Sequence, residues 1–241
     1  MKSLANWKMT SALMVLTLIV FVLCYFCTNL IGGSAYNSLF FVCSGIFGSL
    51  LDKSKEQRIV GVLLIVLVVA YIGILCLENG HNAVNILIGV GYGLIGGICG
   101  FIYAKCSHIF SIQTGLTTLQ ILAVRFNLML ICLLFFIRPD IVQWLSIKSI
   151  LYMLFLSLVS NVLPVYFFQR GIIASGPEKN AIAIAFVPVL TMVIGVMIDS
   201  EFLSKTDIYF SILLSVFLMI PTALKLRAKL GKSNENSGQT M

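Results

Sequence analysis

Residues 59–77 read IVGVLLIVLVVAYIGILCL and contain no charged side chain. A bilayer core about 30 Å thick requires roughly 20 apolar residues in a helix that crosses it, and this stretch has that length. Seven further stretches come close to the same condition. The sequence therefore predicts an all-α, polytopic transmembrane helix bundle of about eight helices, with spans at residues 9–29, 33–51, 59–77, 84–104, 115–137, 149–168, 181–198 and 207–224.

The composition excludes an ordinary soluble domain. Hydrophobic residues make up 59% of the 241 residues and charged residues only 10%, whereas about a quarter of a typical soluble domain is charged. The excess of 16 Lys and Arg over 9 Asp and Glu raises the alternative of a nucleic-acid-binding protein. The mean hydropathy is +1.04, and the cations lie in small groups between apolar runs. These two features exclude nucleic acid as a partner and predict that the chain lies in a lipid bilayer.

The cysteines and the N-terminus give no sign of a metal site or a cleaved leader. All seven Cys lie in or beside apolar spans, where a free thiol behaves as a small hydrophobe. Cys24 and Cys27 form a CxxC, but no second pair stands at zinc spacing, so we expect no metal and no cofactor. Lys2 and Lys8 precede an apolar run that is too long for a signal peptide and lacks an A-x-A site, which indicates a retained first helix.

The distribution of basic residues predicts the orientation, because Lys and Arg concentrate in cytoplasmic loops. With the N-terminus inside, twelve of the 16 Lys and Arg fall on the cytoplasmic side and three fall outside, while Arg125 lies within a span. We therefore expect both termini in the cytoplasm. The outer residues are Arg138, Lys148 and Lys205.

Two acidic residues mark an internal repeat. Asp52 and Glu201 each end a short span of small and apolar residues, and each precedes a mostly polar loop that leads into another apolar span. Five predicted helices lie between them, and an odd number places the two positions on opposite faces of the membrane. This pattern is typical of the inverted-topology repeats of secondary transporters.

The segments around these acids resemble the EamA family of the drug/metabolite transporter superfamily. In that family each half carries a proline within a helix, an acid about a dozen residues later and a glycine at the start of the next helix. The segment FVPVLTMVIGVMIDSEF matches with Pro188 and Glu201, and FVCSGIFGSLLDKSKEQRIVG matches with Asp52 and Gly61. LTTLQILAVRF is similar to the Arg-bearing second helix of a half, which maps that motif onto Arg125. The sequence departs from the family pattern at two positions. Leu39 stands where the first half would carry its proline, and Phe210 stands where the second half would carry its glycine.

The resemblance implies an EamA-like architecture with an incomplete first half. Family members have about ten helices in two halves, so this chain is shortened by about two helices at its N-terminus. We expect an incomplete half at 1–80, a complete half at 81–224 and a basic, polar cytoplasmic tail at 225–241. Three interpretations remain open: a shortened gene product, a start codon assigned too late, or a subunit completed by another copy or a partner subunit.

Arg125 is the first candidate for a substrate pathway, because a charge at the bilayer centre costs several kcal/mol. The alternative is that it pairs with a helix carbonyl or extends to the interface. Its predicted span and the residues just before it hold polar stripes that include Gln113, Thr114 and Thr117. The resemblance implies that the family helix corresponding to the sixth predicted helix here lines the cavity, and that the cavity also opens at the turn between the first two predicted helices. Further candidates for the pathway are Asn161, Tyr166, Tyr92, Asn29 and Tyr36, and Tyr103 lies on the same helix as Tyr92.

Small residues and prolines predict helix packing or gating. Gly89, Gly93 and Gly97 recur at four-residue spacing, which lets helices approach closely. We reject dinucleotide binding by the GxGxxG of this segment, because no strand precedes it. Pro164 is expected to kink the sixth helix and Pro188 to bend the seventh.

All nine acids lie in predicted loops, tails or helix ends, and His81 and His108 lie in predicted loops. A buried pair of titratable groups is lacking, which weakens a membrane enzyme. The first hypothesis is a secondary transporter, an exporter of a small polar metabolite such as an amino acid, in an inner or plasma membrane. The alternative is a non-transporting membrane component with an assembly or regulatory role.

Overall fold

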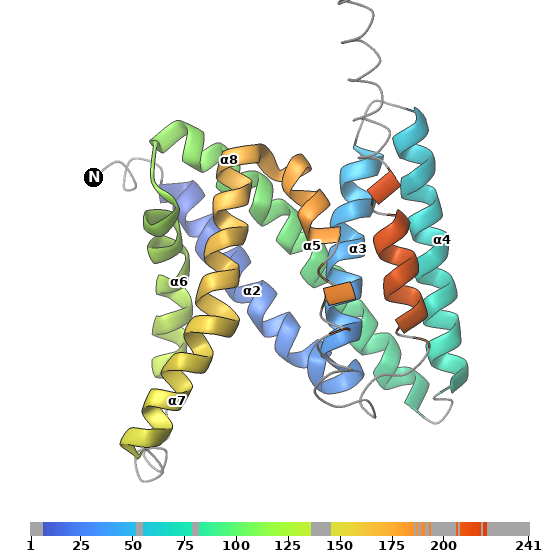
Figure 1. The fold of residues 1–241 in the computed structure, drawn as a ribbon, viewed down its shortest axis with the longest axis horizontal. Helices are drawn as coiled ribbons and strands as arrows, with labels where there is room; N and C mark the ends of the chain where they lie inside the picture. Colours follow the sequence, from blue (N-terminus) through green and yellow to red (C-terminus); the bar gives the residue numbers. More distant parts are fainter. Residues whose placement is uncertain are drawn as a thin grey trace, which may run out of the picture. The chain divides into compact units, whose positions relative to one another are not determined.

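The computed structural model describes residues 7–51, 55–78, 82–135, 146–185, 187, 189–190, 193, 206, 208–217 and 219–220. Its regular structure over these residues is helical throughout, as the sequence predicts (Figure 1). The elements are α2 (Trp7–Ile31), α3 (Gly33–Leu50), α4 (Lys55–Glu78), α5 (Ala83–Thr114), α6 (Thr118–Leu134), α7 (Ile147–Ser157), the π-helix η3 (Leu158–Val162) and α8 (Leu163–Ala185).

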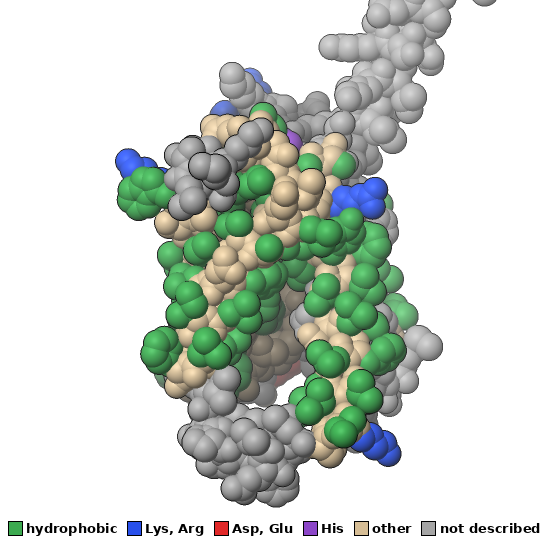
Figure 2. Space-filling model, turned by 90° about the vertical axis from the view of Figure 1, so that its left-hand side faces the viewer, with side chains coloured by type: hydrophobic (Ala, Val, Ile, Leu, Met, Phe, Trp, Pro, Cys, Tyr) green, Lys and Arg blue, Asp and Glu red, His purple; other side chains and the backbone are tan. Residues whose placement is uncertain are grey.

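Within the described ranges, three helical segments are long and apolar enough to cross a membrane: Trp7–Ile31, Arg58–Glu78 and Ala83–Thr114. Shorter apolar helices include Thr118–Leu134 and Ile147–Ser157. On the helices that face the viewer in Figure 2, hydrophobic side chains predominate and few Lys and Arg side chains are seen. This distribution supports the prediction of a membrane protein with transmembrane helices.

The chain forms two compact units, and neither is continuous in sequence. The first unit combines Met1–Phe21 with Ile102–Asn180, and the second combines Val22–Phe101 with Ala181–Met241. The chain passes from one unit to the other within α2, within α5 and again within α8.

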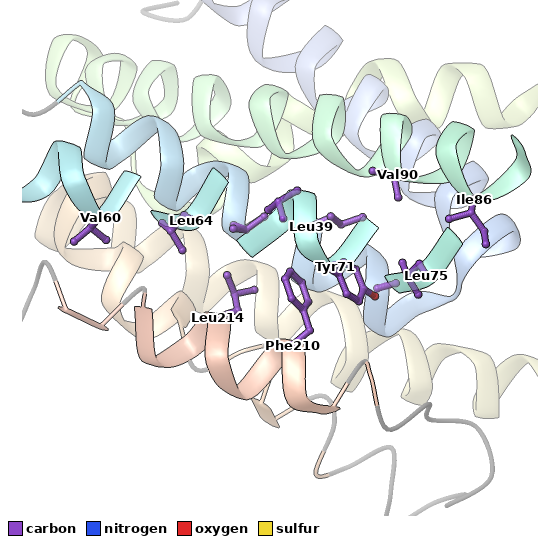
Figure 3. Close-up of a cluster of buried hydrophobic side chains, with 12 residues drawn as sticks. Leu39, Val60, Leu64, Tyr71, Leu75, Ile86, Val90, Phe210 and Leu214 are labelled. Carbon is purple, nitrogen blue, oxygen red and sulfur yellow. The ribbon is translucent and has the colours of Figure 1, made fainter. Parts of the chain in front are cut away.

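The core of the second unit is built by α3, α4, the first part of α5 and the segment Ile208–Phe217 (Figure 3). Leu39, Leu64 and Leu214 are fully buried in it. The ring of Tyr71 on α4 stacks on Phe210 at 3.8 Å between centroids. A buried hydrogen bond of 2.7 Å joins the hydroxyls of Ser38 and Ser211. The C-terminal segment is therefore packed into this core, although it is distant from α3 and α4 in sequence.

The first unit has its own apolar core. Leu13 of α2, Phe110 of α5, Ile121 of α6 and Ile172 of α8 are all fully buried there. Four helices thus meet through large aliphatic and aromatic side chains. Because such burial stabilises each helix through its neighbours, the core also determines where these helices end.

The predicted loop after residue 104 is wrong, because α5 continues to Thr114. Burial of Phe110 holds this last part of the helix in the core, so His108, Gln113 and Thr114 lie on α5. Gly115 then reverses the chain with a φ of 63°. Thr117, which we expected within the next span, is instead the N-cap of α6 and exchanges hydrogen bonds with Gln120.

The predicted loop after residue 168 is also wrong. The helical path from Ile147 continues through η3 and α8 to Ala185, and Gln169 and Ile172 on α8 are fully buried. Pro164 is the second residue of α8, and just before it the N–H of Leu163 bonds to the carbonyl of Leu158. This wider turn accommodates a proline, which has no N–H of its own to donate and crowds the preceding turn.

Candidate functional site: a buried polar chain at Arg125

Arg125 lies near the middle of α6, a helix that contains no acidic residue. Its side chain is only 7% exposed, and the other buried residues of the helix are Ile121 and Leu122. The guanidinium therefore faces the first unit's interior together with two aliphatic side chains. A cation in such a position requires specific partners, because burial removes it from water.

The partner of Arg125 is the hydroxyl of Tyr103 on α5, which accepts a hydrogen bond of 2.7 Å from Nη1. The Cζ of Arg125 also lies 4.4 Å from the Tyr103 ring centroid and 4.7 Å from that of Phe126. At these distances the rings attract the cation electrostatically. The guanidinium is thus held by one hydroxyl and two aromatic rings, none of which is an anion.

The hydrogen bonding continues from Tyr103 into α8. The Tyr103 hydroxyl donates to Oε1 of Gln169 at 2.5 Å, and Nε2 of Gln169 donates to the hydroxyl of Ser107 at 2.6 Å. Tyr103, Ser107 and Gln169 are buried like Arg125. These four residues, called the Arg125 chain below, connect α5, α6 and α8.

One donor of Arg125 remains unused. Its Nε atom is buried and makes no hydrogen bond among the residues that the structure describes. A buried N–H without an acceptor is costly, by about 1–3 kcal/mol for a neutral group and more for a charged one. The guanidinium therefore keeps a donor for which the described residues provide no acceptor.

The acids of the first unit are few and distant along the chain. The only ones in its sequence are Asp140 and Glu178. Asp140 follows the end of α6 at Leu134, and Glu178 lies about 14 Å farther along α8 than Gln169 at the rise of an α-helix. Neither residue belongs to the described surroundings of Arg125.

Two other pathway candidates belong to the first unit. Asn161 lies in η3, and its side chain is outside the described part of the structure. Tyr166 is half-buried on α8, and its ring packs edge to face against Phe167. The contacts described for Tyr166 thus do not include the Arg125 chain.

The remaining candidates belong to the second unit. Asn29 is exposed in the last turn of α2, Tyr36 is buried on α3, and Tyr92 is half-buried on α5. The Tyr36 ring packs against Phe40 and the Tyr92 ring against Phe26. The structure therefore distributes the predicted site residues over both units, three in each.

The glycines predicted for packing lie on α5 where it meets α2 and α3 within the second unit. A Cβ added at Gly89 would lie 2.8 Å from Ile31, and one at Gly93 would lie 3.1 Å from Leu39. At Gly97 the added atom would lie 2.7 Å from the backbone oxygen of Phe40. Pro188, Asp52 and Glu201 lie outside the described residues.

The sequence did not identify Gln169 or Ser107 as candidate site residues, although both are fully buried members of the Arg125 chain. Both fall in segments that we expected to be loops. A longer helix through Phe168 and Ile172 would have placed Gln169 among apolar residues, and that is the signal that could have identified it.

Over the part of the chain that the structure describes, no group of three or more His, Cys, Asp or Glu side chains is positioned to hold a metal ion. The seven cysteines are free thiols. The polar chemistry described at this site is therefore that of a guanidinium, hydroxyls and an amide. No protein-family model, curated protein or solved structure matches this chain.

Proposed function

We propose that this chain is a secondary membrane transporter that exports a small polar metabolite, such as an amino acid or a related compound. Its resemblance to the EamA family implies this activity and a mechanism of alternating access. The observation that supports the proposal most is Arg125, a buried cation near the middle of an apolar helix. Ionisable residues within membrane helices are costly and commonly mark substrate pathways.

Helix packing alone is a weak reason for such a residue. A buried charge loses its hydration, and well-packed apolar side chains of similar volume often serve stability equally well or better. The Arg125 chain connects α5, α6 and α8 through side chains only. A ligand bound to the guanidinium would therefore act on three helices at once, which is the coupling that alternating access requires.

Counterflow in proteoliposomes tests the proposal. Vesicles containing the purified chain are preloaded with unlabelled amino acids and related metabolites, and the uptake of each labelled compound is measured. We expect saturable uptake of at least one compound that protein-free vesicles do not show. Uptake equal to that of protein-free vesicles over the whole set would contradict a transporter.

A non-transporting membrane component is the second candidate, and the hydrogen bonds at the Gln169 end of the Arg125 chain favour it. Gln169 and Ser107 are fully buried and bond within the unit, as expected of a polar network that only fixes helix packing. This alternative predicts no counterflow. It also predicts that cells with and without the protein contain and release the same metabolites, which an untargeted comparison measures.

A further inference from the structure

We infer that Arg125 is the anchor for an anionic group, a carboxylate or a phosphate, of the transported metabolite. The inference rests on the proposed function and specifies its substrate class. A guanidinium carries five N–H groups in a planar fork and therefore needs several acceptors when it is buried. Tyr103 accepts from Nη1, whereas the buried Nε has no acceptor among the described residues.

The electrostatic surroundings of Arg125 also favour an anion. The cation lies near two aromatic rings, which attract positive charge but do not provide the oxygen acceptors that its N–H groups prefer. No acid occurs in the sequence between Glu78 and Asp140, which includes all of α5 and α6. Because no anionic side chain contacts Arg125 among the described residues, a ligand that supplies the counter-charge would stabilise this buried cation.

The geometry of the fork indicates the shape of that group. Carboxylate and phosphate oxygens pair with adjacent N–H groups of a guanidinium through two parallel hydrogen bonds. In Arg125 the Tyr103 hydroxyl satisfies one donor, and a two-oxygen anion could use the Nε side of the fork. A neutral amide or hydroxyl would offer fewer acceptors and no charge.

Thermal unfolding of the purified protein in detergent, followed with a thiol-reactive dye that labels the seven free cysteines, measures this binding. The probes are the common amino acids, sodium lactate, sodium succinate and inorganic phosphate. Lactamide and succinamide are the neutral counterparts, and sodium chloride matches the ionic strength. A ligand that binds only the folded protein raises the unfolding temperature in proportion to its occupancy. We expect at least one anion, and neither neutral amide, to raise it.

The substitutions Arg125→Gln and Arg125→Lys separate the guanidinium from the rest of the site. Loss of charge-assisted hydrogen bonds in Arg125→Gln should weaken anion binding by about tenfold or more. Arg125→Lys keeps the charge without the fork and tests the site if the glutamine variant does not fold. The matched control is Arg170→Gln, since Arg170 is an exposed arginine on α8 beside Gln169 and should leave binding unchanged.

Each outcome is decisive for the anchor. An anion-induced shift that survives both Arg125 substitutions overturns it, and so does a wild-type protein that no anion in the set stabilises. Counterflow of a neutral metabolite at equal rates by the wild type and Arg125→Gln would leave the transporter standing and remove the anionic anchor. Absence of both counterflow and binding would remove both proposals.

Discussion

Arg125 sets the direction of every hydrogen bond in its chain. A guanidinium only donates, so the Tyr103 oxygen must accept from it and the Tyr103 proton is directed to Gln169. Because Oε1 of Gln169 accepts, its amide N–H₂ faces Ser107. A single cation thereby fixes the orientation of side chains on two other helices.

Removing the Tyr103 hydroxyl should interrupt this arrangement while keeping the ring. Tyr103→Phe leaves Nη1 of Arg125 and Oε1 of Gln169 without their shared partner in a buried site. We expect a loss of stability of about 1–3 kcal/mol, because an unpaired buried polar group keeps its full desolvation cost. Thermal unfolding with the thiol-reactive dye measures the change as a lower unfolding temperature.

Tyr92→Phe is the matched control for this substitution, since Tyr92 is a half-buried tyrosine on the same helix whose ring packs against Phe26. It should change the unfolding temperature much less than Tyr103→Phe does. Equal effects of the two substitutions would contradict the role assigned to the Tyr103 hydroxyl.

At this scale the sequence was informative about Arg125 but not about its partners. A lone cation in an apolar span can be recognised by residue type alone. Tyr103 and Gln169 are separated by a long stretch of sequence, and their contact depends on how α5 and α8 pack. Hydrogen bonds between distant residues follow from tertiary structure, which one-dimensional periodicity does not specify.

Among the elements, α5 is the one whose packing depends most on glycine. In the second unit Gly97 allows α5 to approach the backbone of α3 at Phe40 and the side chain of Cys43. A Cβ at Gly97 would lie 2.5 Å from the Cβ of Cys43, which is closer than real side-chain contacts. The two helices must therefore separate to admit any larger residue.

Gly97→Ala should consequently destabilise the protein by about 1–3 kcal/mol, the usual cost of overfilling a packed interface. Gly91→Ala is its control, because a Cβ there would meet no atom within 4 Å. At Gly91 the better helix propensity of alanine, worth up to about 1 kcal/mol, should leave stability unchanged or increased. Dye-monitored unfolding of both variants measures the difference, and a larger loss at Gly91 than at Gly97 would refute this account of the packing.

The helical class and most helix starts could be predicted from apolar runs, whereas two helix ends could not. Polar residues such as Lys105 and His108 resemble a loop in sequence. In the structure Phe110 is fully buried in the first unit, and this tertiary contact extends α5 beyond them. Burial by a neighbouring helix thus overrides the local signal.

For the whole molecule, the number of membrane crossings is the decisive quantity. Among the described residues, three helices have the length and hydropathy to span a bilayer, and the predicted span 181–198 begins within α8. If Ile147–Ala185 and the residues after it crossed the membrane only once, four crossings would separate Asp52 from Glu201. The inverted repeat requires five crossings, so the sidedness of these two positions distinguishes the arrangements.

The most direct measurement is labelling of single cysteines, Asp52→Cys and Glu201→Cys, in a variant whose native cysteines have been replaced. A membrane-impermeant maleimide is applied to intact cells and, separately, to inverted membrane vesicles. The inverted repeat predicts that position 201 is labelled only in intact cells and position 52 only in inverted vesicles. Labelling of both positions from the same side would contradict the repeat, and with it the alternating-access transporter proposed for this chain.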